Sequence, residues 1–397
     1  MEDKISPMTW IITLCSIIMV GLDYLTLQRL CSDERKRCWW MVLLGIIDTL
    51  PTSIGAPTYL FSVDNQIVLQ KAYEWACFGY MILGVARQPI NLALLLGKSR
   101  ALRATGFTVS AVAMAIFIYG AVVTRTDYKI NHITLTSNRL PASFDGYRVV
   151  QFTDLHLGSL LNPTKESERV VELCNSLDAD MVAFCGDLTH IRHSEVTPEL
   201  TDILSRLKSR DGVYSVLGNH DIGVYVRDSI ALPPQENTRR VIEAEQQMGW
   251  QLLDDATAYI TRGEDSISIT GISFSQTLQE ERHSANLPEV DFSRAYEGIS
   301  PEHYNITLSH IPQLWDRILE LHPADLTLSG HTHAMQVAVR VGQRRLSPAA
   351  IIYKRWSGLY DEQGKYLYIN DGIGNVMFPM RVGARPEITL LELKSGK

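Results

Sequence analysis

The stretch VLGNHD, residues 216–221, ends an apolar run with an amide, an imidazole and a carboxylate in three consecutive positions. The apolar run is typical of a buried strand, so Asn219, His220 and Asp221 would stand where that strand ends. A single polar group at the end of a strand is weak support for a site. The question is therefore whether other runs in the chain end in the same way.

The stretch YRVVQFTDLHLG, residues 147–158, gives a second case, with a strand predicted over 147–153 and Asp154 and His156 just beyond it. An Asp-x-His pair alone often arises by chance. Three more apolar runs end alike: 181–185 before Asp187, 306–308 before His310, and 326–328 before His331 and His333. Ligands bind beyond the strand ends in open α/β sheets, so five such ends indicate one shared site.

The candidate ligands combine carboxylate, amide oxygen and imidazole without thiolate, which favours Mn, Fe or Zn over a structural zinc site. They are Asp154, His156, Asp187, Asn219, His310, His331 and His333. Seven ligands exceed what one ion needs. Two divalent ions about 3.5 to 4 Å apart, bridged by one carboxylate, would use them all and could stabilise in-line attack on phosphorus.

In residues 148–336 the order Asp-x-His, Gly-Asp, Gly-Asn-His-Asp, His and Gly-His-x-His resembles the calcineurin-like metallophosphoesterases. The lead-in LPASFDGYRVVQFTDLHLG, residues 140–158, and the tail YINDGIGNVMFPMRVGARPEITLLEL, residues 368–393, resemble the branch of that family with N-terminal transmembrane segments. The resemblance implies an α/β fold, a four-layer α/β/β/α sandwich of two mixed sheets, preceded by a transmembrane helical region.

The resemblance also implies a role for each motif residue. Asp187 would bridge the two ions; Asp154, His156 and His333 would complete one metal site, and Asn219, His310 and His331 the other. A hydroxide between the metals would attack phosphorus, and His220 would act as the acid for the leaving group. Independently of the resemblance, we expect Asp221 to hydrogen-bond the His220 ring and hold its tautomer, with a helix N-cap as the alternative role.

Some positions depart from that branch of the family. His190 stands where an acidic residue is common, and Ala334 and Met335 stand where two glycines are common. We interpret His190 as a solvated loop histidine, with an extra phosphate or metal contact as the alternative. In the tail, Asp371 and Asn375 either line the cleft or only make turns.

Residues 1–127 hold four long apolar segments, 8–27, 39–60, 72–96 and 106–123, each near the ~20 residues that a helix needs to cross a bilayer. We predict a membrane region with about four transmembrane helices over residues 1–127 and a catalytic domain over 128–397. Asp48 interrupts the second segment and Arg87 the third. These two either pair with each other or lie near a membrane interface.

Charge excludes some partners. Residues 128–397 carry 26 Lys and Arg against 35 Asp and Glu, and no basic run offsets this excess. An acidic domain repels phosphate backbones, so we expect no nucleic acid partner, and a nuclease is disfavoured. The six cysteines show no disulfide framework.

The basic residues of the short loops predict the orientation in the membrane. Seven lie between the first and second or the third and fourth segments: Arg29, Arg35, Lys36, Arg37, Lys98, Arg100 and Arg103. Four lie on the opposite side: Lys4, Lys71, Arg125 and Lys129. The catalytic domain is therefore expected to be extracytoplasmic, in a bacterial inner membrane.

The expected function is a membrane-anchored, dinuclear metal-dependent phosphoesterase that hydrolyses a phosphoester or pyrophosphate bond. Its partners would be the lipid bilayer and a phosphorylated small-molecule or lipid substrate. Lipid-linked or nucleotide-sugar pyrophosphates, phospholipid head groups and soluble esters all remain open. The alternative is a catalytically weak metal-binding sensor or interaction protein of the membrane, which the complete ligand set and His220 disfavour.

Overall fold

The computed structural model describes residues 7–51, 66–223, 225–226, 232–274, 290–300, 302–321, 324–342 and 344–396. Contacts divide the chain into two compact units. The first, the membrane unit, consists mainly of Met1–Arg125; the second, the catalytic unit, covers Thr126–Val226, Ala231–Asn375 and Gly383–Lys397. Each unit is described by itself below.

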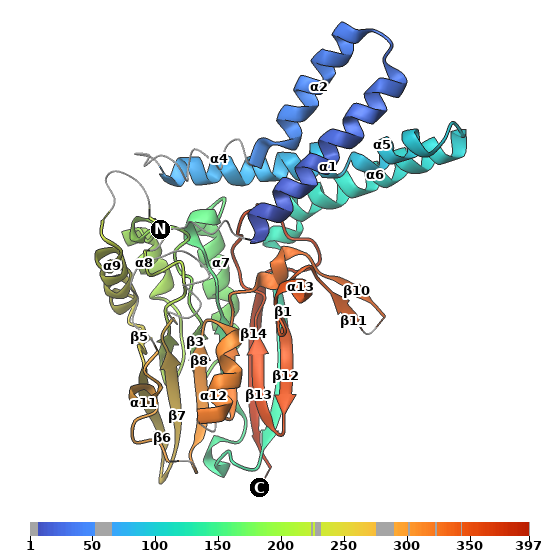
Figure 1. The fold of residues 1–397 in the computed structure, drawn as a ribbon. Coiled ribbons are helices and arrows are strands. Elements are labelled where there is room, and N and C mark those ends of the chain that lie inside the picture. The colour runs from blue at the N-terminus through green and yellow to red at the C-terminus, as the bar shows by residue number, and fades with distance from the viewer. Residues whose placement is uncertain are drawn as a thin grey trace. The chain divides into compact units, whose positions relative to one another are not determined.

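The membrane unit is helical (Figure 1). Its helices are α1 (Pro7–Leu30), α2 (Glu34–Asp48), α4 (Gln66–Gly79), α5 (Gln88–Leu96) and α6 (Arg100–Val122), with a π-helical turn (Tyr80–Val85) and a short 3-10 turn (Thr124–Thr126). Within the described residues three stretches are long and apolar enough to cross a membrane: Ile12–Leu30, Val68–Leu96 and Arg100–Thr126.

These three stretches correspond to the first, third and fourth predicted spans. The second prediction, residues 39–60, overlaps α2, which covers 15 residues and ends at Asp48. Residues 52–60 of that prediction lie outside the described part of the chain. The Arg87 interruption of the third span coincides with a change of helix type, since the π-helical turn ends two residues before it.

Arg87 joins two buried carboxylates inside the membrane unit. Its Nη2 lies 2.7 Å from Asp23 Oδ2 in α1 and 2.6 Å from Asp48 Oδ1 at the end of α2. Asn91 of α5 donates from Nδ2 to Asp23 Oδ1 at 2.6 Å. The pair between Asp48 and Arg87 is therefore formed, with Asp23 as a second partner. A charge in lipid surroundings is costly unless it is paired in this way.

The first sheet of the catalytic unit has the strand order β1-β14-β2-β3-β4-β5. Strands β2 to β5 run parallel, β14 is antiparallel to β2, and β1 is parallel to β14. The strands are β1 (Lys129–Ser137), β14 (Glu387–Ser395), β2 (Tyr147–Phe152), β3 (Met181–Phe184), β4 (Val213–Ser215) and β5 (Gln251–Leu252).

The second sheet has the order β12-β13-β9-β8-β7-β6, with a parallel centre and antiparallel edge strands. Its strands are β12 (Gly358–Glu362), β13 (Lys365–Ile369), β9 (Leu326–Ser329), β8 (Tyr304–Ser309), β7 (Asp265–Ile272) and β6 (Ala256–Arg262). A separate hairpin pairs β10 (Val339–Val341) with β11 (Arg344–Leu346).

Buried side chains define the layers. Val149 of β2 and Ile306 of β8 belong to one core between the two sheets, which pack face to face. Helices α7 (Pro163–Asn175), α8 (Pro198–Leu204) and α9 (Pro234–Gln247) cover the outer face of the first sheet. Helices α11 (Phe292–Ala295) and α12 (Trp315–Leu321) cover the second (Figure 1). The predicted four-layer α/β/β/α arrangement is confirmed.

Candidate metal centre

The seven predicted ligands meet at one edge of the two sheets. Those on the first sheet follow β2, β3 and β4, and those on the second follow β8 and β9. All but one are buried, with His331 half-buried. The residues are Asp154, His156, Asp187, Asn219, His310, His331 and His333. Parallel strands bring their carboxyl ends to the same edge, so a pattern spread over 180 residues becomes one cluster.

The backbone of this edge is strained at several ligands. The left-handed region holds Asp154 (φ 53°), His156 (φ 44°), Asp187 (φ 59°), His331 (φ 72°) and His333 (φ 49°). Each such residue costs on the order of 1 kcal/mol or more. Strain of this kind concentrates at functional sites because it aims side chains that ordinary loops would direct elsewhere.

The first group of ligand atoms belongs to Asp154, His156 and His333, which lie within 4.8 Å of one another. His156 Nε2 is 3.1 Å from His333 Nε2, and His333 Nε2 is 3.0 Å from Asp154 Oδ1. Thr153 Oγ1 and the His331 backbone N–H both donate to the Asp154 carboxylate. These donors hold Asp154 as an acceptor that faces the two imidazoles.

The second group consists of Asp187, His310 and His331, again within 4.8 Å. His310 Nε2 lies 3.2 Å from Asp187 Oδ2, 3.1 Å from Asn219 Oδ1 and 3.3 Å from His331 Nδ1. Asp187 Oδ2 is also 3.5 Å from His156 Nε2 of the first group. The Asp187 carboxylate thus stands between the two groups.

The close approach behind Asp187 depends on a glycine. A Cβ at Gly218 would lie 2.1 Å from Asp187 Oδ1 and 2.5 Å from the Asp187 backbone nitrogen. Only a residue without a side chain lets the Asn219 loop come this near. The His220 backbone N–H then donates to Asp187 Oδ1 at 2.8 Å, which leaves Oδ2 directed at the ligand groups.

The donor atoms fit divalent metal ions. His310 Nδ1 lies 2.7 Å from the Cys185 carbonyl, so it carries a proton, and in the neutral ring Nε2 holds a lone pair. Asn219 donates its amide hydrogen to the Tyr225 hydroxyl, which points Oδ1 at His310 Nε2. With Asp187 Oδ2, these are three acceptors with no donor among them. A cation satisfies such a set, and oxygen and imidazole ligands suit Mn, Fe or Zn.

Charge supports the same conclusion. Burial lowers the pKa of His310, but the charges of Asp187 and Asp154 and the hydrogen bonds to Asp187 and the Cys185 carbonyl together outweigh burial and raise it to about 9. Although burial raises the pKa of Asp187, the charges of His310 and His220 hold it well below its usual range. Without a metal ion the cluster therefore keeps a proton on His310. Metal binding displaces that proton, because a ligating imidazole must be neutral.

The expected hydrogen bond from Asp221 to the His220 ring is wrong. His220 Nδ1 lies 2.6 Å from the His190 carbonyl, which accepts its proton. The Asp221 carboxylate instead accepts the backbone N–H groups of Asp187, Gly218 and Thr189 at 2.8 to 2.9 Å. Burial, with the nearby Asp187 charge, raises the pKa of Asp221 to about 7. Asp221 joins the two loops that carry Asp187 and Asn219.

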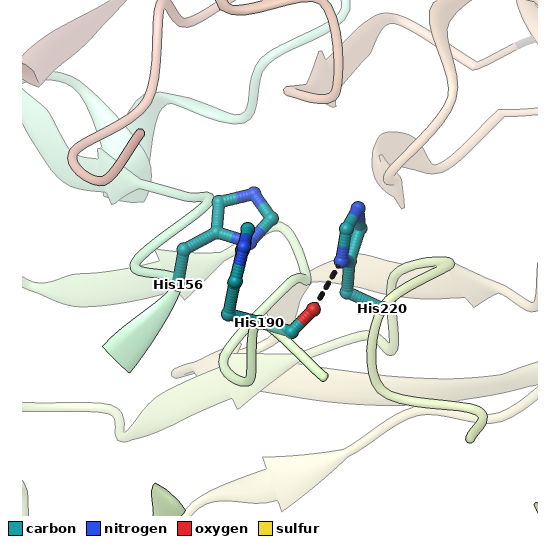
Figure 2. Close-up of side chains that lie close together, drawn as sticks. All are labelled: His156, His190 and His220. Carbon is teal, nitrogen blue, oxygen red and sulfur yellow. Dashed lines mark hydrogen bonds between the residues drawn. The ribbon is translucent and has the colours of Figure 1, made fainter. Parts of the chain in front are cut away.

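His190 is not a solvated loop residue. It is buried, and its Nδ1 lies 3.3 Å from His156 Nδ1. Figure 2 shows its ring beside His156 and its carbonyl oxygen bonded to the His220 ring. The rings of His190 and His220 are stacked, 5.4 Å apart, and Tyr225 stacks on His220 at 4.4 Å. His190 thus contacts both a predicted ligand and the predicted acid.

Sequence reasoning missed the residues that build this pocket. Glu195 accepts the backbone N–H groups of His190 and Ile191 and so folds the loop inward. Tyr225 had no distinguishing pattern in the sequence. In the tail, the Asp371 carboxylate pairs with Arg345, and the Asn375 backbone N–H donates to Ser159 Oγ, 3.0 Å away.

The chain resembles proteins of known family. Residues 147–335 match the calcineurin-like phosphoesterases. A zebrafish (Danio rerio) protein named transmembrane protein with metallophosphoesterase domain is 28% identical over 96% of this chain and 88% of its own length. A cattle (Bos taurus) protein of the same name is 28% identical over 90% and 81%. YkuE of Bacillus subtilis, described as an uncharacterized metallophosphoesterase, is 28% identical over 66% and 84%.

The family match covers the stretch that brings the candidate ligands together, and candidate metal-ligand groups lie inside it. The relatives named as transmembrane proteins align along nearly the whole chain, including the apolar helices that precede this stretch. This chain therefore carries a calcineurin-like metallophosphoesterase domain after apolar N-terminal helices, and it is a metal-dependent phosphoric ester hydrolase.

Proposed function

We propose that the chain is a membrane-anchored phosphoesterase that works with two divalent transition-metal ions and hydrolyses a phosphoester or pyrophosphate bond. Asp154, His156 and His333 would hold one ion, and Asn219, His310 and His331 the other. The observation that carries the proposal is the position of Asp187, whose Oδ2 lies 3.5 Å from His156 Nε2 and 3.2 Å from His310 Nε2. A carboxylate between two ligand groups is what a bridged pair of ions requires.

When bound, the two ions supply positive charge for the phosphoryl oxygens and acidify a water molecule. The rest of the chemistry belongs to side chains. His220 Nδ1–H donates to the His190 carbonyl, so in the imidazolium form Nε2 carries the second proton and gives it to the leaving oxygen, which leaves the ring neutral with its proton on Nδ1. Asp187, bonded through Oδ1 to the His220 backbone N–H, holds this imidazole beside the centre. His220 is the proposed acid and Asp221 a positioning residue.

The substrate class follows in part from charge. Residues 128–397 have nine more acidic than basic side chains, which disfavours a nucleic acid backbone. A small phosphorylated molecule or a lipid-linked phosphate remains. A screen of the full chain with Mn²⁺ against mono-, di- and pyrophosphoesters measures the preference. Turnover of DNA above all small esters would contradict the assignment.

The acid role has its own test. His220→Ala should keep most of the bound metal yet lower kcat by ~10² to 10⁴, the usual worth of a positioned acid. Esters with good leaving groups should suffer less, because they depart without a proton. His132→Ala, an exposed histidine in β1, is the matched control and should change neither metal content nor kcat. Equal losses for good and poor leaving groups would exclude His220 as the acid.

We also propose that residues 1–127 anchor the enzyme in a bacterial inner membrane, with the domain over 128–397 outside the cytoplasm. The support is the greater number of Lys and Arg residues in two loops, seven against four, as counted above. Protease added to intact spheroplasts should then digest the chain after Tyr128. Digestion only after lysis would place the domain in the cytoplasm.

A further inference from the structure

The metal-bearing edge of the catalytic unit is also the edge at which the chain arrives from its last apolar helix. Strand β14 is antiparallel to β2, and β1 is parallel to β14, so β1 begins at the edge where β2 ends. Helix α6 ends at Val122 and β1 begins at Lys129, which leaves the six residues 123–128 between them. Such a connection spans at most ~22 Å. The covalent connection from the last apolar helix to this edge is therefore short.

At the same edge, the segment between β9 and β12 carries exposed apolar side chains. Between the loop after β9 and strand β12 the chain forms the β10–β11 hairpin and the short helix α13 (Ala349–Ile352). Five apolar residues there are exposed: Val339 (52%), Val341 (59%), Leu346 (54%), Ile351 (85%) and Ile352 (50%). We call these five the apolar tip. Figure 1 shows the hairpin projecting beyond the strands of the sheets.

The arrangement of these side chains suits a bilayer surface. Val339 is paired with Leu346 and Val341 with Arg344, so the hairpin has one largely apolar face. Three exposed cations lie in the same segment: Arg344 beside Val341, Arg340 on the other face of the hairpin, and Lys354 just after α13, where it also pairs with Asp316 at 3.3 Å. These cations stand out in a domain whose net charge is negative. Apolar side chains bordered by Arg and Lys are typical of segments that lie in the headgroup region of anionic membranes.

The tip is joined to the metal centre by short contacts. Ser347 Oγ donates to the Ala334 carbonyl at 2.7 Å, and Ala334 directly follows His333. The Tyr353 ring, next to α13, lies 6.0 Å from the His331 ring. Arg345 of β11 pairs with Asp371 and stacks over Trp356 at 5.5 Å. Whatever the tip binds is therefore held close to the ligands.

We propose that the apolar tip inserts into the headgroup region of an anionic lipid bilayer and holds the metal centre at the lipid–water interface. This placement rests on the proposed function, because it takes the N-terminal helices as membrane anchors. Phosphoesters in lipid head groups would then lie within reach of the centre. The occupant is lipid rather than a second copy of the chain, because the basic rim matches anionic head groups and the chain itself supplies the anchor.

Depth measurements on the full chain test the placement without any turnover. Cys15, Cys31 and Cys38 are replaced by Ser, and Ile351→Cys is labelled with an environment-sensitive fluorophore in vesicles of phosphatidylcholine and phosphatidylglycerol. Nitroxide groups high on the lipid acyl chains should quench this label at least about twofold. A label at Tyr259→Cys, 45% exposed in the edge strand β6, is the matched control and should be quenched by aqueous iodide only.

Two results would overturn the proposal. If iodide quenched the label at residue 351 as strongly as it quenches the label at residue 259, the tip would lie in water. Blue-shifted emission without quenching by lipid nitroxides would mean that protein, either the membrane helices or a second copy, covers the tip. Because the label reports without catalysis, an inactive enzyme whose label is still quenched by lipid would refute the proposed function and leave the docking intact.

Charge variants sharpen the same test. Arg340→Glu with Arg344→Glu should weaken lipid quenching at residue 351 in anionic vesicles and leave it unchanged in pure phosphatidylcholine. Neither residue belongs to the candidate metal centre, so hydrolysis of a soluble aryl phosphate should stay within about twofold of the parent. An equal loss of quenching in both lipids would contradict the assigned role of the basic rim.

Discussion

The molecule has two buried polar clusters, and they neutralise their carboxylates in different ways. In the membrane unit Asp23 and Asp48 share the guanidinium of Arg87 at 2.7 and 2.6 Å. In the catalytic unit Asp154 and Asp187 face imidazoles and an amide oxygen, with no Lys or Arg among the seven candidate ligands. One cluster contains its own counter-ion. The other brings acceptor atoms from several loops together without a guanidinium or ammonium among the candidate ligands.

This difference shows how to tell a structural ion cluster from a metal centre. Where a guanidinium pairs with both carboxylates, their charge is balanced within the protein and no cation from solution is required. A set of acceptors without a donor is costly unless a cation or a proton enters it. The left-handed backbone at Asp154 and Asp187 adds to this contrast, since Asp23 and Asp48 have ordinary helical or helix-end backbone. Of the two clusters, the one with left-handed backbone is the one where chemistry is proposed.

The largest expected effect comes from removing the bridging charge. Asp187→Asn should reduce hydrolysis to near background, because both proposed ion sites lose their shared anionic ligand. Metal content should fall at both sites. Asp178→Asn is the matched control, since Asp178 also has a positive φ but is exposed and pairs with Arg210. Full activity of the Asp187→Asn variant would contradict the claim that the catalytic cluster, unlike the membrane cluster, works by binding metal ions.

The membrane cluster should respond in stability rather than in metal binding. Arg87→Leu leaves two buried carboxylates without their cation, which costs about 3 to 5 kcal/mol. The measurement is the temperature at which buried Cys77 becomes reactive toward a thiol dye in detergent, in a variant with Cys77 as its sole cysteine. Exposed Arg100→Leu is the control.

Replacing all three charged groups sharpens this test. Asp23→Asn, Arg87→Gln and Asp48→Asn together should recover most of the stability that Arg87→Leu loses, because no unpaired charge remains. A chelator should leave the Cys77 transition unchanged in every variant. If the Arg87→Leu variant unfolded at the same temperature as the Arg100→Leu variant, the stability of the membrane unit would not depend on the cation inside the cluster.

His190 should have the smallest effect of the three. His190→Ala removes the ring beside His156 Nδ1 but keeps the backbone carbonyl that accepts the hydrogen bond from His220 Nδ1. Loss of such an outer partner typically weakens metal affinity 10- to 100-fold. Competition with a chelator measures this affinity directly, without relying on turnover. His193→Ala, whose ring bonds Asn237 instead, is the control. Unchanged affinity in His190→Ala would leave the residue a packing role only.

The candidate ligands could be predicted because each one follows an apolar run that became a strand. Asp187 after β3 and His310 after β8 are examples, and the parallel topology alone then brings them to one edge. The same reasoning fails for His190, because its burial depends on Glu195 five residues later, whose carboxylate accepts four backbone N–H groups from this loop and from Gly158. No periodicity encodes such a loop.

One other prediction failed because of the surroundings of the residue, and one stays untested. The expected partner of Asp221 is its neighbour His220. In the structure the Asp221 carboxylate instead accepts hydrogen bonds from three backbone N–H groups of nearby loops. In the membrane unit, hydropathy predicts a second span over residues 39–60, and α2 (Glu34–Asp48) covers the first part of it. Residues 52–60 lie outside the described part of the chain, so this span stays a prediction.

The metal content of the purified, fully active chain tests the central claim most directly. Elemental analysis should find close to two transition-metal ions per chain, and chelation should remove both the ions and hydrolysis, with recovery when Mn²⁺ is returned. Chelation should also lower the stability of the catalytic unit, because ions that bind only the folded state stabilise it. At most one ion per chain in fully active protein, or activity that survives complete removal of metal, would contradict the account.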